Sequence, residues 1–177
     1  MALQSNTLLG AILETPRLVL REFTHGDDAF LLRLLNEPSW LRFIGDRGVR
    51  TLEDARRYVD DGPSRSQAKN GFALWCVDLK GAGPIGMCGL VLRDVLPGPD
   101  VGFAFLPEAW GKGYAVESAA AVLDHARDVL GMVRVLAITN PDNEASIRVL
   151  ERIGMGCDGT IRLPGETLDL LLFARDL

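Results

Sequence analysis

The chain has 177 residues, enough for one domain that buries roughly 70% of the surface exposed by its unfolded form. Apolar residues make up 47% and charged residues 24%, which is ordinary for a globular protein. The formal net charge of −5 argues against a nucleic-acid partner. We therefore expect a single domain over residues 1–177 that does not bind nucleic acid.

The three cysteines, Cys76, Cys88 and Cys157, are odd in number and lack the spacing of metal ligands. This pattern favours free thiols in a reducing compartment and no bound metal. No apolar run is long enough to cross a membrane, and the first residues do not resemble a secretion signal. We expect a cytoplasmic protein without a membrane partner.

The first part of the chain predicts one strand and two helices. Alternating apolar and polar residues over 17–23 predict the strand, and apolar spacing over 29–35 predicts the first helix. Residues 36–48 contain a proline and two glycines and are expected to form a loop. A Thr and an Asp at capping-box spacing open a second helix over 51–60, which a polar stretch over 61–70 follows.

In the second part strands and helices alternate. Helices are predicted over 113–130 and 143–153, and strands over 72–79, 85–93, 100–106, 133–139, 156–162 and 167–174. The complete order is β-α-α-β-β-β-α-β-α-β-β. It predicts a mixed α/β fold in which one mixed, mostly antiparallel sheet of about seven strands has helices on both faces.

Residues 103–117 hold the most informative pattern, a sharp turn with Gly111 and Gly113 between a strand and a helix. Glycine lets backbone N–H groups come close to a ligand. A helix start adds unpaired N–H groups and a partial positive charge. The run therefore predicts a cradle for an anion such as a pyrophosphate.

Two familiar phosphate loops fit this run poorly. A P-loop requires Gly-Lys-Ser/Thr after four intervening residues, but here Lys112 precedes Gly113 and Leu106 stands five residues before Gly111. A dinucleotide fingerprint would need a small residue at Val116. A nicotinamide-dependent oxidoreductase thus depends on the Gly111-x-Gly113 pair alone.

A third loop fits better. Trp110-Gly-Lys-Gly-Tyr-Ala115 resembles the Q/R-x-x-G-x-G/A acyl-CoA loop of the GNAT N-acetyltransferase superfamily, with Trp110 in place of Gln or Arg. Residues 14–21 are similar to the opening strand of the RimJ/RimL-like branch, and 105–107 to the strand end before the loop. Residues 143–155 are similar to its second CoA-side motif. Together these segments, in the family's order, extend over nearly the whole chain.

The resemblance implies an acetyltransferase with acetyl-CoA as donor and no metal. In such enzymes two parallel strands splay apart, and the acyl-pantetheine arm lies between them as an added strand would. The backbone of Phe103 and Phe105 would pair with its amides, and the amides from Gly111 to Val116 would hold the pyrophosphate. The cofactor-binding residues implied in this way are Phe103, Phe105, Trp110, Gly111, Lys112, Gly113, Tyr114, Ala115, Val116, Asn140 and Asn143.

The reaction implied is direct attack of a neutral amine on the thioester in a ternary complex. Asp100 is the predicted general base, because it precedes the cradle on a strand where related enzymes often carry Glu. A carboxyl with an ordinary pKa of about 4 needs burial to become an effective base. The alternative is that Asp100 only ends the Pro97-Gly-Pro turn.

The leaving thiolate requires a proton or a hydrogen bond. Many superfamily members use a Tyr seven residues after the motif Asn, but here Leu150 follows Asn143 at that distance. Ser146 is the predicted substitute, although it could equally be an ordinary serine of a first helical turn. We expect His25 and His125 to be surface or packing residues rather than bases.

The acceptor is an amine whose identity stays open between a protein N-terminus and a small molecule. Trp40 and Phe43 are candidate walls of its pocket, Glu166 is a weaker candidate, and Trp75 is expected in the core. The chain could act as a monomer or a homodimer. Since Leu150 cannot donate a proton, a catalytically silent acyl-CoA-binding module is the alternative function.

Overall fold

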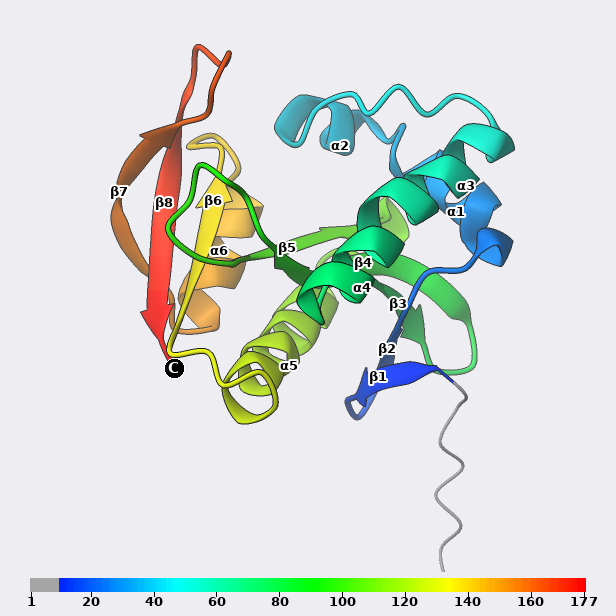
Figure 1. The fold of residues 1–177 in the computed structure, drawn as a ribbon, viewed down its shortest axis with the longest axis horizontal. Coiled ribbons are helices and arrows are strands. Elements are labelled where there is room, and N and C mark those ends of the chain that lie inside the picture. Colours follow the sequence, from blue (N-terminus) through cyan, green and yellow to red (C-terminus); the bar gives the residue numbers. More distant parts are fainter. Residues whose placement is uncertain (1–9) are drawn as a thin grey trace, which may run out of the picture.

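The computed structural model describes residues 10–177, in which eight strands form one sheet of order β1-β2-β3-β4-β5-β6-β8-β7 (Figure 1). The strands are β1 (Ala11–Glu14), β2 (Leu18–Arg21), β3 (Leu74–Leu79), β4 (Gly83–Val91), β5 (Asp100–Phe105), β6 (Arg134–Thr139), β7 (Gly156–Arg162) and β8 (Asp169–Asp176). The α-helices are α1 (Asp28–Leu34), α2 (Pro38–Phe43), α3 (Leu52–Val59), α4 (Arg65–Asn70), α5 (Tyr114–Asp128) and α6 (Glu144–Arg152). This arrangement confirms the predicted mixed, mostly antiparallel fold.

The sheet changes character between β5 and β6. These two strands are parallel and share a single bridge, with Asp100 opposite Leu136, whereas the other neighbouring pairs are antiparallel. Beyond the bridge the strands run in different directions, β6 alongside β8 and β5 alongside β4 (Figure 1). The sheet therefore opens at the carboxyl ends of β5 and β6.

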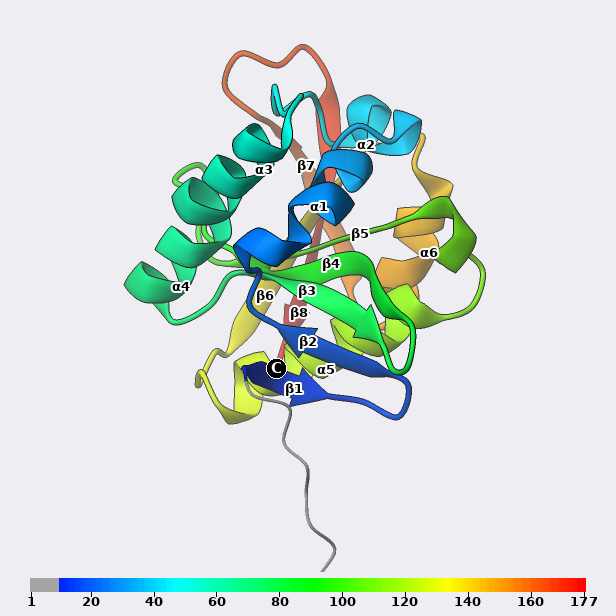
Figure 2. The ribbon, with the colours of Figure 1, turned by 90° about the vertical axis from the view of Figure 1, so that its right-hand side faces the viewer.

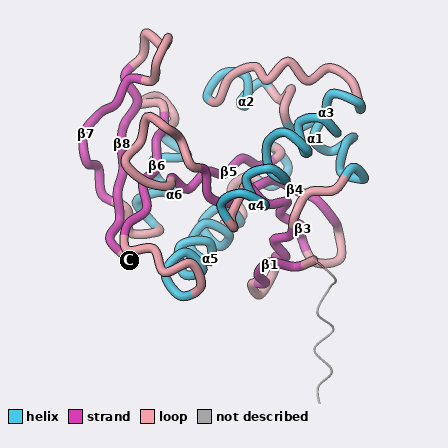
Figure 3. The backbone as a smooth tube through the Cα atoms, viewed as in Figure 1, coloured by secondary structure: helices cyan, strands magenta, loops and turns pink. Residues whose placement is uncertain are grey.

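Helices cover both faces of the sheet because its central strands are apolar on both sides. Trp75 of β3 and Cys88 of β4 lie in the core cluster that contains α5, whereas Cys76 and Met87 lie in the cluster of α1 and α3. Figures 2 and 3 show α1 to α4 on one side of the strands and α5 on the other. No helix within residues 10–177 is both long and apolar enough to cross a membrane.

One local prediction was wrong, and two elements were not predicted. The predicted loop over 36–48 contains α2, which begins at Pro38. Proline is tolerated at the first position of a helix, because the backbone N–H of that position has no partner within the helix. The polar stretch over 61–70 continues the helix through a π turn (Asp60–Ser64) into α4, which buries no residue and so has no amphipathic pattern. Strand β1 was missed, and it raises the number of strands from about seven to eight.

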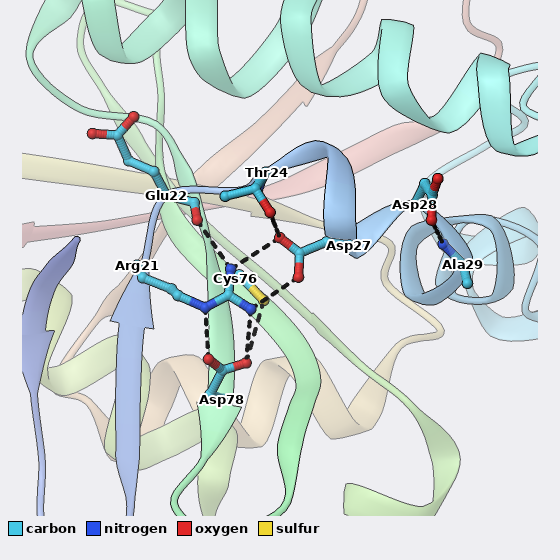
Figure 4. A network of polar contacts seen from close by, with 8 residues as sticks. All are labelled: Arg21, Glu22, Thr24, Asp27, Asp28, Ala29, Cys76 and Asp78. Atoms are coloured by element: carbon cyan, nitrogen blue, oxygen red, sulfur yellow. Dashed lines mark hydrogen bonds and ion pairs between the residues drawn. The ribbon is translucent and has the colours of Figure 1, made fainter. Parts of the chain in front are cut away.

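A polar network fastens the start of α1 to the sheet (Figure 4). Arg21 on β2 donates from Nη1 and Nη2 to the two carboxylate oxygens of Asp27, both at 2.9 Å, and from Nε to Asp78 on β3 at 2.6 Å. The hydrogen bond to Asp27 raises the pKa of Arg21 further above its ordinary value. Since Asp27 is buried, losing Arg21 would leave an unpaired charge and release α1 from the strands.

Candidate active site

The turn before α5 has the backbone conformation that the sequence predicts. Gly111 and Gly113 have φ values of +71° and +82°, in the left-handed region that favours glycine. Gly113 is the N-cap residue of α5, and its carbonyl accepts the first helical bond, from Glu117, at 3.0 Å. The N–H groups of the first turn of α5 therefore lie free of intrahelical partners beside the turn.

The ion pair between Arg17 and Glu117 holds this turn in place. Arg17, between β1 and β2, donates from Nη1 to the carbonyl of Lys112 at 2.9 Å and from Nε to Glu117 at 2.6 Å. Thr15 also donates to Glu117, at 2.6 Å, and the Arg17 guanidinium lies 4.6 Å from the centre of the Tyr114 ring. These contacts fix the turn and the start of α5 against the first hairpin.

The edge of β5 is free in the part that faces the opening. The N–H of Leu106 donates to Ile85 on β4, and in an antiparallel ladder alternate residues point the other way. The backbones of Phe103 and Phe105 therefore face β6, beyond the single bridge between these strands. The Phe105 carbonyl already accepts a bond from the Trp110 indole at 2.8 Å and has one lone pair left.

One cavity of about 570 Å³ contacts most of the predicted site residues. Its lining includes Asp100, Phe103, Phe105, Trp110, Gly111, Gly113, Tyr114, Ala115, Val116, Asn143 and Ser146. Lys112 and Asn140 are outside this lining, and the Asn140 side chain accepts a bond from the N–H of Asp142. The structure thus brings together predicted residues from 100–116 and from 143–146, and their roles stay predictions.

The cavity has two walls. The turn side consists of lining residues from 101–116 and 137–152, which belong to β5, the glycine turn, α5, β6 and α6. The arm side consists of lining residues from 34–58, which belong to α1, α2, α3 and the loop before α3. Asp100 and Arg93 lie in the same lining, near the bridge between β5 and β6.

Asp100 is a buried carboxyl whose pKa is raised. Its side chain is buried, and the residue is only 1% exposed. Arg93 donates from Nε to both carboxylate oxygens, at 3.0 and 3.2 Å. Burial raises the pKa of Asp100 to about 6, although the charge of Arg93 opposes this shift. Asp100 is the first residue of β5 and directly follows the Pro97-Gly-Pro turn, and its role as a base stays a prediction.

Helix α6 contributes the other predicted polar residues. Asn143 caps the helix, since its side-chain oxygen accepts from the N–H of Ser146 at 3.2 Å. This bond leaves the amide N–H groups of Asn143 for another partner. Ser146 lines the cavity and is partly exposed, and Leu150 also lines it, although its side chain is buried in the core.

The aromatic and basic candidates lie in three different places: the cavity wall, the core and the surface. Trp40 and Phe43 line the arm side of the cavity. Trp75 is fully buried and packs edge-on against His125, with ring centres 5.5 Å apart, so both are packing residues. His25 is exposed and pairs with Asp60 at 2.8 Å. Glu166 is exposed and lies outside the lining of the cavity.

Sequence reasoning missed four residues at the site. Arg17 contacts the glycine turn from about 95 positions away, and no local pattern could reveal that contact. Arg93 and Asp100 flank the Pro97-Gly-Pro turn, so opposite charges across a short hairpin were a usable signal. Arg47 and Tyr58 line the arm side, and neither belongs to a motif.

A glycine turn at a helix start, beside a strand edge opened by a splayed neighbour, is the arrangement that the resemblance to acyl-CoA-dependent acyltransferases implies. Residues 17–156 match the family described as Acetyltransferase (GNAT) domain. The chain therefore belongs to the GNAT acetyltransferase family. This membership confirms the predicted enzyme class and its acetyl-CoA donor, and it leaves the oxidoreductase alternative without support.

Similar proteins agree with this assignment. The uncharacterized protein YkkB of Bacillus subtilis is 34% identical over 85% of this chain and 88% of its own length. The uncharacterized N-acetyltransferase YoaA of the same organism is 28% identical over 85% and 86%. A GNAT-family acetyltransferase from Bacillus anthracis has a TM-score of 0.77 at 26% identity, over 93% of this chain and 97% of that one. RimL, a ribosomal L7/L12 α-N-protein acetyltransferase solved with coenzyme A, shares the fold, with a TM-score of 0.80 at 18% identity over 94% and 98%.

Proposed function

We propose that this protein transfers the acetyl group of acetyl-CoA to a primary amine by direct attack within a ternary complex. The observation that carries the proposal is the continuity of one cavity from the glycine turn, along the free edge of β5, to the buried carboxyl of Asp100. Donor and acceptor can then occupy the two ends of the same space, which brings the amine to the thioester.

The donor binds on the turn side. The first-turn N–H groups of α5 and the glycine turn hold the pyrophosphate, because both the helix dipole and the free donors favour an anion. The pantetheine amides pair with Phe103 and with the N–H of Phe105, whose backbones face the opening. Lys112 and Asn140 are outside the lining, so we assign them at most outer contacts.

The chemistry begins with an acceptor amine that has lost its proton. Asp100, with a pKa of about 6, is ionised at neutral pH and receives the proton that leaves the attacking nitrogen. The new C–N bond replaces the C–S bond, and a backbone N–H near Phe103 donates to the oxygen as negative charge develops there. Ser146 donates a hydrogen bond to the departing sulfur, which solvent then protonates.

The experiment follows thiol release from acetyl-CoA with a panel of amines and peptide N-termini, and mass spectrometry identifies the acetylated product. Calorimetry measures acetyl-CoA binding in parallel. Turnover with at least one amine supports the proposal. Binding of acetyl-CoA without turnover of any amine would instead favour the silent acyl-CoA-binding module, for which the buried Leu150 is the motivating observation.

A further inference from the structure

The arm side of the cavity combines aromatic rings with charged groups. Trp40, Phe43 and Tyr58 supply the rings, and Glu37 and Arg47 supply the charges. Pockets for small ligands are commonly apolar with a few placed polar groups that fix orientation. The charged groups of the arm side therefore indicate which chemical groups the acceptor carries.

Pairing separates Arg47 from most other charges of the cavity, although Arg152 on the turn side also lacks an ion pair within residues 10–177. Asp100 is neutralised by Arg93 at 3.0 Å, and Glu37 lies 3.5 Å from Arg33. Within residues 10–177, Arg47 has neither an ion pair nor a side-chain hydrogen bond. Its neighbour Asp46 pairs with Arg50 instead. Arg47 thus places an uncompensated positive charge in the wall of the cavity.

Tyr58 supplies a second donor beside this charge. Its hydroxyl makes no hydrogen bond to the described part of the chain. Every fully enclosed side-chain polar atom there has a partner, so the hydroxyl is open to the cavity that Tyr58 lines. Burial raises the pKa of Tyr58, and the nearby charge of Arg47 opposes that shift, so the phenol keeps its proton and can donate.

We propose that the acceptor is a small primary amine that also carries a carboxylate, and that Arg47 and Tyr58 bind this carboxylate on the arm side. The inference depends on the proposed acetyl transfer. An arginine and a phenol both donate to a carboxylate oxygen, and charge-assisted bonds of this kind are strong. The rings of Trp40 and Phe43 contact an apolar substituent, which makes an apolar α-amino acid the best fit.

The same charges disfavour other acceptors. A polyamine would bring a second ammonium group into the wall that holds Arg47, whose charge repels it, and the carboxylate of Glu37 in that wall is already paired with Arg33. A peptide N-terminus has no carboxylate next to its amine unless an acidic side chain supplies one. The source of the carboxylate is therefore a point that the experiment must decide.

The experiment compares leucine with leucinamide, which differ at the carboxylate. The amine of leucinamide is the weaker base and is neutral more often, so amine chemistry alone favours the amide. We expect leucine nevertheless to have a KM at least about tenfold lower, because charge-assisted bonds to a carboxylate are among the strong hydrogen bonds. Arg47→Gln should reduce the leucine-to-leucinamide preference towards one, and Tyr58→Phe should reduce it by a smaller factor.

Arg57→Gln is the matched control, because Arg57 precedes Tyr58 on α3, is exposed and is not part of the cavity lining. It should keep the preference for leucine. Thermal melts of each variant show whether it is folded. Peptides that begin with Asp and Asn form the second arm, and use of the Asp peptide without use of leucine would overturn the assignment to a small molecule.

A binding measurement separates this inference from the proposed function. Calorimetric titration of leucine and leucinamide into the CoA-loaded protein reports carboxylate recognition even where no acetyl group is transferred. Tighter binding of leucine in the wild type, lost in Arg47→Gln, supports the site. Equal binding of leucine and leucinamide, or acetylation of uncharged amines with equal KM, would overturn it while leaving acetyl transfer intact.

Discussion

The polar contacts that we assign to the donor on the turn side of the cavity are mostly backbone groups, whereas those that we assign to the acceptor on the arm side are side chains. On the turn side the contacts offered are the N–H groups of the α5 start and the edge of β5. On the arm side they are rings and charges carried by α1, α2, α3 and the loop before α3. A backbone surface depends on main-chain conformation and tolerates most side chains, but a side-chain surface changes with each substitution. We therefore expect the donor site to depend little on the identity of its side chains, and the specificity of the acceptor site to change with each substitution.

The strongest test of this difference replaces Gly113 by Val. A β-branched residue resists a φ of +82°, and its Cβ would stand 3.4 Å from Nη2 of Arg17. We expect the substitution to remove two charge-assisted bonds between the turn and the pyrophosphate, each worth roughly 1.5–3 kcal/mol. Acetyl-CoA binding should then weaken at least about 100-fold. Calorimetric titration with acetyl-CoA measures the change.

Gly131→Val is the control for backbone strain. Gly131 also has a positive φ, of +66°, and lies beyond the other end of α5 with nothing within 4 Å of its Cβ position. This variant should lose stability but keep its affinity for acetyl-CoA. Unchanged affinity in Gly113→Val would remove the pyrophosphate from the glycine turn.

Asp100→Asn tests the proposed general base, which lines the cavity at the bridge between β5 and β6. Removal of a general base costs about 100-fold or more in kcat/KM, and we expect this loss at pH 7. The loss should be smaller at pH 9, where more of the amine is already neutral. In the wild type, kcat/KM should rise through a pKa of about 6, and the variant should lack that limb.

The stability of the same variant gives an independent check. Because folding raises the pKa of Asp100 above its unfolded value of about 4, folding favours the protonated form. The corresponding stability is fully present below pH 4 and is lost as the pH rises through 6. Asp100→Asn should remove this part of the pH dependence of the unfolding free energy. If Asp100→Asn lost activity equally at pH 7 and pH 9, the role of Asp100 would be structural.

The difference between the walls also explains what could be predicted from the sequence. The glycine turn and the start of α5 are contiguous, and their conformation demands glycine at two positions, so the pattern is local. Asp100 was found because it lies on the strand that leads into this turn. Tyr58 and Arg47 approach the site from a helix and a loop with no motif, so their place depends on tertiary packing. Helix α2 was missed because its proline suggested a loop.

Ser146→Ala asks whether a side chain on the turn side takes part in the chemistry. One neutral hydrogen bond is worth about 1 kcal/mol, so kcat should fall about fivefold. The N–H of Ser146 remains in the variant, and the Asn143 cap is therefore kept. Acetyl-CoA affinity should stay unchanged in calorimetry. A weaker affinity together with the lower kcat would show that the hydroxyl supports binding rather than departure of the thiolate.

Arg17→Gln should have the smallest effect, although Arg17 makes the longest-range contact to the glycine turn. Its guanidinium is about half exposed, and exposed ion pairs contribute roughly 0–1 kcal/mol, so acetyl-CoA affinity should fall about threefold. Arg162→Gln, which breaks the exposed pair with Asp169 on the final hairpin, is the control and should leave the affinity unchanged. Raising the salt concentration should reduce the difference between Arg17→Gln and the wild type, because salt screens exposed charges. A loss as large as that of Gly113→Val would mean that the conformation of the turn depends on a side chain, and the turn side could then no longer be described as a backbone surface.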